Sequence, residues 1–137
     1  MALSVRTVEY FYANIRDEPA KAYEFLAQLA SEEVNILAFS AVPFGPNYVE
    51  LTIFPDRTET LMNAAQKHGW TLTGPQHACL VQGDDRLGAL ADIQKTLIDA
   101  GVKIYASTGI TGGGGRYGYI IYVKEEDHQR AAKALAP

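Results

Sequence analysis

The residues Gly83-Asp84-Asp85-Arg86-Leu87-Gly88-Ala89-Leu90 join an apolar run at 78–81 to a helical pattern that continues to residue 100. Apolar side chains recur there at spacings of three and four, as on one face of a helix: Leu90, Ile93, Leu97 and Ala100. Gly101 is expected to end this helix, because glycine adopts the left-handed backbone conformation without steric cost. A new strand begins at Val102. The stretch therefore predicts a strand, an acidic turn, a helix and a second strand.

Composition sets limits on the class of protein. The chain has 137 residues, of which 47% are hydrophobic and 20% charged, which is typical of one globular domain or two small ones. Its net charge of -4 disfavours non-specific binding to nucleic acid. No apolar run approaches the roughly 20 residues of a membrane span, and the first residues lack the layout of a signal peptide. A single cysteine, Cys79, predicts a reducing, cytoplasmic location.

The rest of the chain shows the same alternation of elements. The first half predicts strands at 5–15, 34–42, 48–54 and 70–73, with helices from Pro19 to about Ser31 and over 58–68. Pro19 suits the first position of a helix, where its missing N–H is no loss. After Gly74-Pro75, strands are expected at 77–82, 102–110 and 117–123, with helices at 87–100 and 125–136. The second half thus lacks a fourth strand.

The two halves align as an internal repeat. Val34-Asn35-Ile36 and Val102-Lys103-Ile104 stand 68 residues apart, and the same offset places Asp17 on Asp85 and Ala20 on Gly88. We therefore expect an α+β fold of two ferredoxin-like βαββαβ repeats, residues 1–74 and 75–137, with antiparallel sheets and helices on one face. Repeats of this size are small for independent cores, so they are expected to share a core and to self-associate, giving a homodimer.

The acidic turn and the strand after its helix resemble the signature of ACT domains. In that signature an acid, an arginine and a Pro-Gly turn open a helix, and Gly-Val-Asn-Ile follows in the next strand. Here Asp85-Arg86-Leu87-Gly88 and Gly101-Val102-Lys103-Ile104 match it in the second repeat, and Asp17-Glu18-Pro19-Ala20 and Val34-Asn35-Ile36 in the first. The resemblance implies a tandem of ligand-binding regulatory domains, which commonly bind an amino acid where two domains meet.

The resemblance also implies particular site residues. The second repeat keeps the turn glycine, Gly88, and the first keeps the strand asparagine, Asn35. Pairing these two predicts one family-like ligand site: Asp84, Asp85, Arg86, Leu87, Gly88 and Ala89 with Asn35 and Ile36. The opposite pairing predicts a degenerate second site: Arg16 and Asp17 with Lys103. Because no catalytic domain is present, the regulated enzyme or regulator would be a separate chain.

The residues of the turn suit a zwitterion on chemical grounds alone. Backbone N–H groups at the start of the helix can bind a carboxylate, and Asp84 or Asp85 can accept from an ammonium. The simpler alternative is a solvated turn whose acid caps the helix, with Gly88 serving close packing. Asn35 would then only bond a neighbouring backbone group. A ligand-free assembly module therefore stays open as a second function.

The other motifs in the sequence do not predict a catalytic, metal-binding or phosphate-binding site. The run at 112–115 is all glycine but lacks the Lys-Ser/Thr of a phosphate loop, so a hairpin is expected. His68, His77 and His128 lack metal-ligand spacing, and Cys79 reads as an inert small hydrophobe. An enzyme would need a convergent acid-base set, and only scattered histidines are present. We expect no catalytic residue, no metal and no cofactor.

Overall fold

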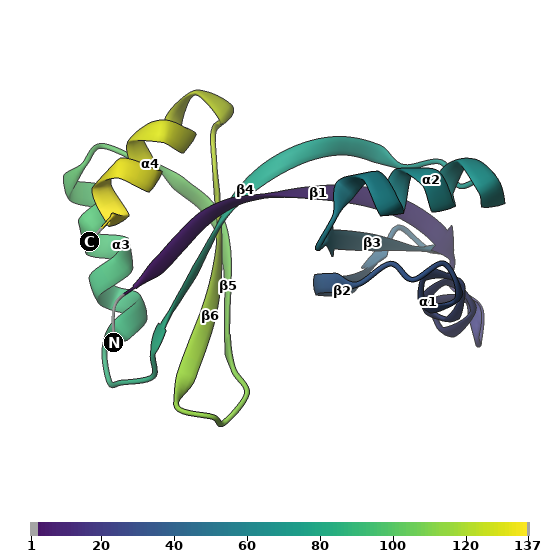
Figure 1. The fold of residues 1–137 in the computed structure, drawn as a ribbon, viewed down its shortest axis with the longest axis horizontal. Coiled ribbons are helices and arrows are strands. Elements are labelled where there is room, and N and C mark those ends of the chain that lie inside the picture. The colour runs from purple at the N-terminus through teal and green to yellow at the C-terminus, as the bar shows by residue number, and fades with distance from the viewer. Residues whose placement is uncertain (1–2, 137) are drawn as a thin grey trace. The chain divides into compact units, whose positions relative to one another are not determined.

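Strands and helices alternate along the chain in the computed structural model, which describes residues 3–136. The elements run β1 (Ser4–Arg16), α1 (Lys21–Ser31), β2 (Ile36–Phe44), β3 (Tyr48–Pro55), α2 (Thr58–His68), β4 (Thr73–Asp84), α3 (Ala89–Asp99), β5 (Ile104–Thr111), β6 (Arg116–Val123), a 3-10 turn (Glu125–Asp127) and α4 (His128–Leu135) (Figure 1). Within the described residues, no helix is long and apolar enough to cross a membrane.

The chain forms two compact units whose boundary differs from the sequence division at residues 74 and 75. Residues 9–76 form the N-terminal unit, whereas residues 3–8 and 77–136 together form the C-terminal unit. The reason lies in Gly74-Pro75, which the sequence suggested as punctuation but which lies inside the continuous strand β4. A Cβ on Gly74 would stand 2.9 Å from the Phe11 ring and from the Tyr10 carbonyl oxygen. This glycine therefore serves the close approach of β4 to β1.

The missing fourth strand of the second repeat has a substitute. Residues 77–136 contribute only part of β4 with β5 and β6, and the strand order β2-β3-β1-β4-β6-β5 places β1 beside β4. Leu3 and Val5 pack against the core of the C-terminal unit, and Val8 is buried. The start of β1 thus completes this unit, while the rest of β1 is the first strand of the other. The predicted α+β fold of two βαββαβ repeats is confirmed.

The register of the strands confirms the repeat at the predicted offset. Phe11 pairs with Ile53 across β1 and β3, and Cys79 pairs with Ile121 across β4 and β6, each residue 68 positions further on. The β2–β3 and β5–β6 pairs also share an irregularity at equivalent places, between Ile36 and Ala38 and between residues 104 and 106. A bulge conserved between the halves is a detail that chance similarity would not reproduce.

In each unit, helices cover one face of the sheet and close a core. Ile93 and Leu97 of α3 and Leu135 of α4 pack on β4 and β6 in the C-terminal unit (Figure 1). Phe25 and Leu29 of α1 and Leu61 of α2 do the same in the N-terminal unit: they pack on Phe11, Leu51 and Ile53. The apolar helix spacing read from the sequence thus identifies the buried faces.

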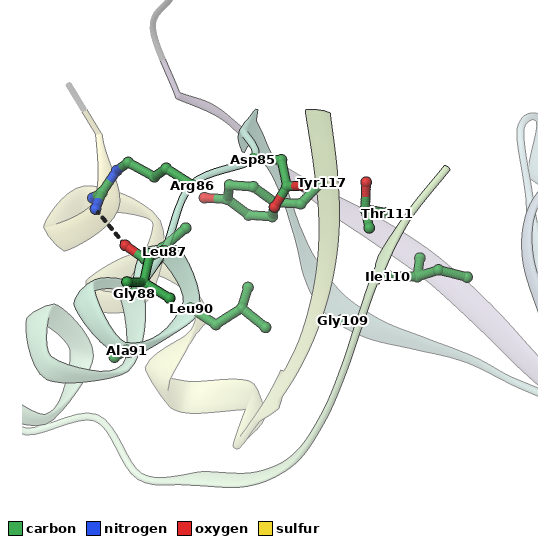
Figure 2. Close-up of a pocket in the computed structure, with 11 residues that line it drawn as sticks. Asp85, Arg86, Leu87, Gly88, Leu90, Ala91, Gly109, Ile110, Thr111 and Tyr117 are labelled. Carbon is green, nitrogen blue, oxygen red and sulfur yellow. Dashed lines mark hydrogen bonds between the residues drawn. The ribbon is translucent and has the colours of Figure 1, made fainter. Parts of the chain in front are cut away.

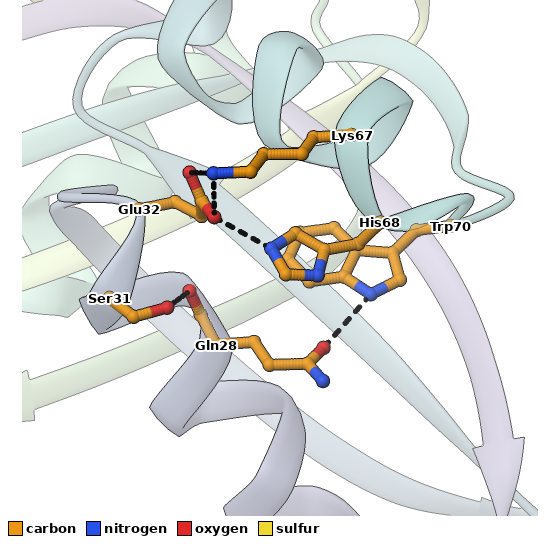
Figure 3. Close-up of polar contacts among 6 residues, drawn as sticks. All are labelled: Gln28, Ser31, Glu32, Lys67, His68 and Trp70. Carbon is orange, nitrogen blue, oxygen red and sulfur yellow. Dashed lines mark hydrogen bonds and ion pairs between the residues drawn. The ribbon is translucent and has the colours of Figure 1, made fainter.

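A polar cluster links the ends of α1 and α2. Glu32 accepts from His68 Nε2 at 2.8 Å and pairs with Lys67 Nζ at 3.1 Å (Figure 3). The His68 ring stacks on Trp70, with centroids 4.9 Å apart, and the indole donates to Gln28 Oε1 at 3.1 Å. The hydrogen bond from His68, and then that from Lys67, lower the pKa of Glu32. The cluster therefore fixes the two helix ends against each other.

Several boundaries differ from the sequence prediction: the strands expected from 34 and 102 begin at Ile36 and Ile104, and the last helix begins at His128 after a 3-10 turn. Pro19 precedes α1 instead of opening it, because Ala20 at the N-cap has a left-handed φ of 71°. Leu87 likewise lies in the turn before α3 rather than within the helix. The run 70–72 is not a strand, because β4 begins at Thr73.

Candidate functional site

The acidic turn between β4 and α3 is held at both ends. Asp84 closes β4 and pairs with Arg116 of β6 at 3.2 Å. The N–H of Asp85 donates to the carbonyl oxygen of Gly115 at 2.9 Å, which ties the turn to the β5–β6 hairpin. The glycine run at 112–115 is thus a hairpin connection, as predicted. These contacts fix where the following helix begins.

The start of α3 leaves backbone donors open. Gly88 is the N-cap at a φ of 83°, and no side chain caps the helix. The N–H of Ala89 donates to the Arg86 carbonyl oxygen at 3.2 Å. The N–H groups of Leu90 and Ala91 find no acceptor among residues 3–136. Helix N-termini with free N–H groups attract anions, so a carboxylate fits here.

The charged side chains of the turn differ in whether they form an ion pair. Arg86 forms an ion pair with Asp92 of α3, and this contact raises the pKa of the Arg86 guanidinium. Its Nη1 also donates to the Leu87 carbonyl oxygen at 3.4 Å. Asp85, by contrast, has no ion pair within the described part of the chain. The side chain of Asp85 is therefore the one left to accept from a ligand cation.

An open hollow of about 750 Å³ lies against this turn, within the C-terminal unit. The turn and the first residues of α3 form one wall, and Gly109, Ile110 and Thr111 of β5 form another (Figure 2). Tyr117 lies between them and is only 6% exposed. Figure 2 shows its hydroxyl directed toward the turn. Burial raises the pKa of Tyr117, and the nearby Arg86 lowers it by less.

The Tyr117 hydroxyl is an open polar group in an otherwise buried residue. It forms no hydrogen bond with any residue between 3 and 136. Tyr117 was not among the site residues predicted from the sequence. Its position follows from register, because Tyr117 pairs with Gly83 just before the acidic turn. Since Gly83 has no side chain, the tyrosine ring packs over it.

Two leucines line the mouth of the hollow: Leu87 is fully exposed at 100% and Leu90 is 37% exposed. The side chain of Ile110 lies on the face of the sheet opposite the helices, because Ile110 pairs with Gly118 between the inward-facing Tyr117 and Tyr119. Leu90 leans over Gly109, where an added Cβ would stand 2.8 Å from its Cδ1. The β5 residues were also missed by the sequence-based prediction. The hairpin expected at 111–115 is the signal that could have placed them beside the turn.

The alternative that Gly88 serves close packing is contradicted by the structure. A Cβ at Gly88 would have no atom within 4 Å, so the residue faces open space. The positive φ of 83° is what favours glycine here. The turn is thus held in a left-handed conformation with its backbone accessible from the hollow.

The other predicted site residues lie in ordinary surface positions. Asn35 is exposed just before β2, rather than inside a strand, and its carbonyl oxygen accepts the Asp56 N–H at 2.8 Å. Ile36 begins β2, and Lys103 is exposed just before β5. Asn35 belongs to the N-terminal unit and Gly88 to the C-terminal unit, so their pairing in one site stays a prediction.

The predicted degenerate site has no comparable chemistry in the N-terminal unit. Arg16 lies over the Tyr48 ring, 5.4 Å from its centroid, and the Asp17 N–H donates to Asn47 O at 2.9 Å. At the offset of 68, the positions of Arg86, Leu87 and Tyr117 hold Glu18, Pro19 and Val49. The guanidinium, the exposed leucine and the phenol of the C-terminal hollow are thus all replaced.

Two histidines and the cysteine meet elsewhere in the C-terminal unit. His77 Nδ1 stands 3.2 Å from Glu125 Oε1, and the rings of His77 and His128 have centroids 5.9 Å apart. Cys79 Sγ lies 4.0 Å from His128 Nδ1, and burial raises the pKa of its thiol, so it is a poor nucleophile. Among residues 3–136 no three potential ligands gather as a metal site.

Comparison with solved structures supports the fold. A protein from Bacteroides thetaiotaomicron superposes with a TM-score of 0.80 at 14% identity, over 96% of this chain and 88% of the other. The regulatory subunits of aspartate kinase from Thermus thermophilus and Thermus flavus give TM-scores of 0.69 and 0.63, at 15% and 13% identity, each over 98% of this chain and 95% of theirs. At such identities the likeness establishes the tandem ACT-type fold alone. No protein-family model and no curated protein matches the sequence.

Proposed function

We propose that this chain is a non-catalytic regulatory protein that binds a small molecule, an amino acid, in the hollow beside Gly88. The observation that carries the proposal is that two open groups line one hollow: the N–H groups at the start of α3 and the Asp85 carboxylate. Each needs a partner that the described chain does not supply. A zwitterion offers both complementary partners, a carboxylate for the N–H groups and an ammonium for Asp85.

Each open group binds the end of the zwitterion that has the complementary charge. The ligand carboxylate accepts from the N–H groups of Leu90 and Ala91, where the helix dipole favours an anion. The ammonium donates to Asp85, whose charge no described cation neutralises. Arg86 holds the turn through Asp92 rather than binding ligand.

The regulatory part of the proposal draws on the fold. Two of the structures with this fold are regulatory subunits of aspartate kinase, and their length nearly equals that of this chain. By analogy, ligand binding here would be passed to an enzyme or regulator on a separate chain, in the cytoplasm. On the basis of the ACT resemblance, we further propose that Asn35 and Ile36 contribute to the ligand site.

A ligand-free assembly module is the second candidate, and exposed sheet edges favour it. β2 and β5 stand at the two ends of the strand order, so each has a free edge. They expose large apolar side chains: Val42 and Phe44 on β2, and Tyr105 and Ile110 on β5. Such edges tend to pair with another chain, so we propose a homodimer in either case.

Thermal unfolding against the twenty amino acids, each at millimolar concentration, separates the two candidates. A ligand at a hundred times its dissociation constant adds about 2.7 kcal/mol of stability and raises Tm by several degrees. Gly88→Glu should abolish the shift by filling the hollow. The matched control is Ala20→Glu, at the equivalent N-cap of α1 with the same left-handed φ, which should leave the shift intact.

Two further variants test the individual contacts. Asp85→Asn should weaken binding, while Asp17→Asn, its counterpart in the first repeat, should not. Asn35→Ala tests the residue contributed by the ACT resemblance. If no amino acid raises Tm, the assembly module becomes the better account, and the oligomeric state measured by light scattering becomes the next observable.

A further inference from the structure

We infer that the contact between the acidic turn and the glycine run at 112–115 opens locally in the native protein, and that a ligand in the hollow closes it. This contact, the clasp, consists of the Asp84–Arg116 ion pair and the hydrogen bond from the Asp85 N–H to the Gly115 carbonyl oxygen. The closing by ligand rests on the proposed function and adds a means of regulation to it. The opening is measured without any ligand.

The first repeat forms an equivalent contact 68 residues earlier. There the N–H of Asp17 donates to the carbonyl oxygen of Asn47 at 2.9 Å, the same length as the hydrogen bond of the clasp. Arg16 lies over the Tyr48 ring, 5.4 Å from its centroid, at the two positions that hold the ion pair in the second repeat. The contact therefore belongs to the fold, and the repeats differ in the residues that form it.

The hairpin that supplies the acceptor is much less constrained in the second repeat. It reads Phe44-Gly45-Pro46-Asn47 in the first repeat and is all glycine at 112–115 in the second. Gly45 and its counterpart Gly113 share a positive φ, of 70° and 86°, so the difference lies in the other three positions. Glycine loses more conformational freedom than other residues when a loop is fixed. Each such replacement shifts the opening equilibrium by about two- to fivefold.

Other contacts add little to hold this hairpin closed. The side chains of Asp84 and Arg116 are 48% and 36% exposed, and an exposed ion pair contributes weakly to stability. Thr111 Oγ1 donates to the Arg116 carbonyl oxygen at 2.9 Å and accepts from the Gly113 N–H at 3.2 Å, both at the surface. A Cβ on any of the four glycines would meet no atom within 4 Å, so the hairpin does not pack on the unit.

The clasp connects the two walls of the hollow. The acidic turn forms one wall, and Thr111, which directly precedes the glycine run, belongs to the other (Figure 2). When the clasp opens, Asp85 loses its fixed position relative to the start of α3. A ligand that contacts both groups binds the closed form more tightly and therefore shifts the equilibrium toward it. The hairpin is then the segment whose order reports binding.

Native-state hydrogen exchange of the intact protein, followed by NMR, tests the opening. Once intrinsic exchange rates are divided out, protection of the Asp85 amide should be at least about eightfold lower than that of Asp17, because three hairpin positions differ. It should also be lower than that of Ile121, which is fully buried in the core of the same unit. Equal protection of Asp85 and Asp17, or of Asp85 and Ile121, overturns the inference.

Reciprocal variants assign the difference to the hairpin. Gly114→Pro introduces the residue of the first repeat, and the Gly114 N–H has no acceptor within the described chain, so no hydrogen bond is lost. Protection of Asp85 should rise about two- to fivefold, and Pro46→Gly should lower that of Asp17 by as much. Gly114→Ala, whose Cβ lies in open space, should act in the same direction without the ring of proline. Unchanged protection of Asp85 in both Gly114 variants overturns the inference.

Added amino acids separate the closing of the clasp from the function on which it rests. An amino acid that raises Tm should slow exchange at Asp85 and leave Asp17 unchanged. If it raises Tm but leaves exchange at Asp85 unchanged, the proposed function stands and closing by ligand is overturned. If the clasp opens as expected but none of the twenty amino acids raises Tm or slows exchange, the proposed function and closing by ligand are both overturned, whereas the opening is supported.

Discussion

Ala20 and Gly88 occupy the same position in the two repeats and adopt the same left-handed backbone conformation, with φ of 71° and 83°. Each is the N-cap of its helix, and neither helix has a side-chain cap. In both repeats the N–H of the residue four positions on donates to the cap carbonyl, at 2.8 Å from Glu24 and 3.1 Å from Asp92. The turn geometry thus belongs to the fold, and glycine makes it unstrained in one repeat only.

Replacing Ala20 by glycine should therefore stabilise the protein. An L-residue in the left-handed region costs about 1 kcal/mol, and glycine removes that cost. Urea unfolding should show Ala20→Gly more stable by roughly 0.5–1 kcal/mol and Gly88→Ala less stable by about 1 kcal/mol. A loss of stability in Ala20→Gly would show that the alanine is not strained.

Leu90 and Gly109 should be energetically coupled. Gly109→Ala places a Cβ 2.8 Å from Leu90 Cδ1 and 3.3 Å from Tyr119 Cδ1, which should cost about 1 kcal/mol. In a Leu90→Ala background the same change should be neutral or stabilising, because the first repeat holds Ala22 and Ala41 at these positions. A double-mutant cycle in urea measures the coupling, expected to exceed about 0.5 kcal/mol. If the stability changes of the two single substitutions simply added up in the double variant, the contact between Leu90 and position 109 would be contradicted.

The C-terminal unit should need the start of β1 to fold. A fragment of residues 77–137 retains the sequence repeat but lacks the strand that carries Val5 and Val8. We expect it to be unfolded by circular dichroism. Appending residues 3–8 after residue 136, through a linker copied from residues 69–72 that join α2 to β4, should restore cooperative unfolding. If the fragment alone folded cooperatively, the start of β1 would not be needed as the fourth strand of this unit.

Glu32 should contribute stability that acid removes. Because its pKa is lowered in the folded protein, its contribution is present above the ordinary value of 4.5 and is lost as pH falls through the folded pKa. Glu32→Gln should be less stable than the parent at neutral pH, and the two should converge as the pH falls through the lowered pKa of Glu32. Glu33→Gln, an adjacent acid with no ion pair among the described residues, controls for net charge. If the difference in stability between Glu32→Gln and the parent persisted in acid, the stabilising role of the Glu32 carboxylate would be contradicted.

Local sequence patterns predicted the elements well but not the exchange of strands. The apolar spacing and Gly69 located α2 at its observed bounds, and the 68-residue offset identified the repeat. Gly74-Pro75 was misleading, because a Gly-Pro pair usually breaks a strand, whereas here it allows β4 to pass close to β1. The acidic turn was visible as one contiguous stretch. Tyr117 and Ile110 were missed because only strand register brings them beside it.

Backbone amide chemical shifts during titration with each of the twenty amino acids test the central claim most directly, because each repeat serves as the control for the other. We predict saturable shifts at Gly88, Leu90 and Ala91, where the open N–H groups meet the ligand carboxylate, and none at Ala20, Ala22 and Tyr23, their counterparts 68 residues earlier. Saturable shifts confined to the first repeat, or no shift at residues 85–91 with any amino acid, would contradict the ligand site.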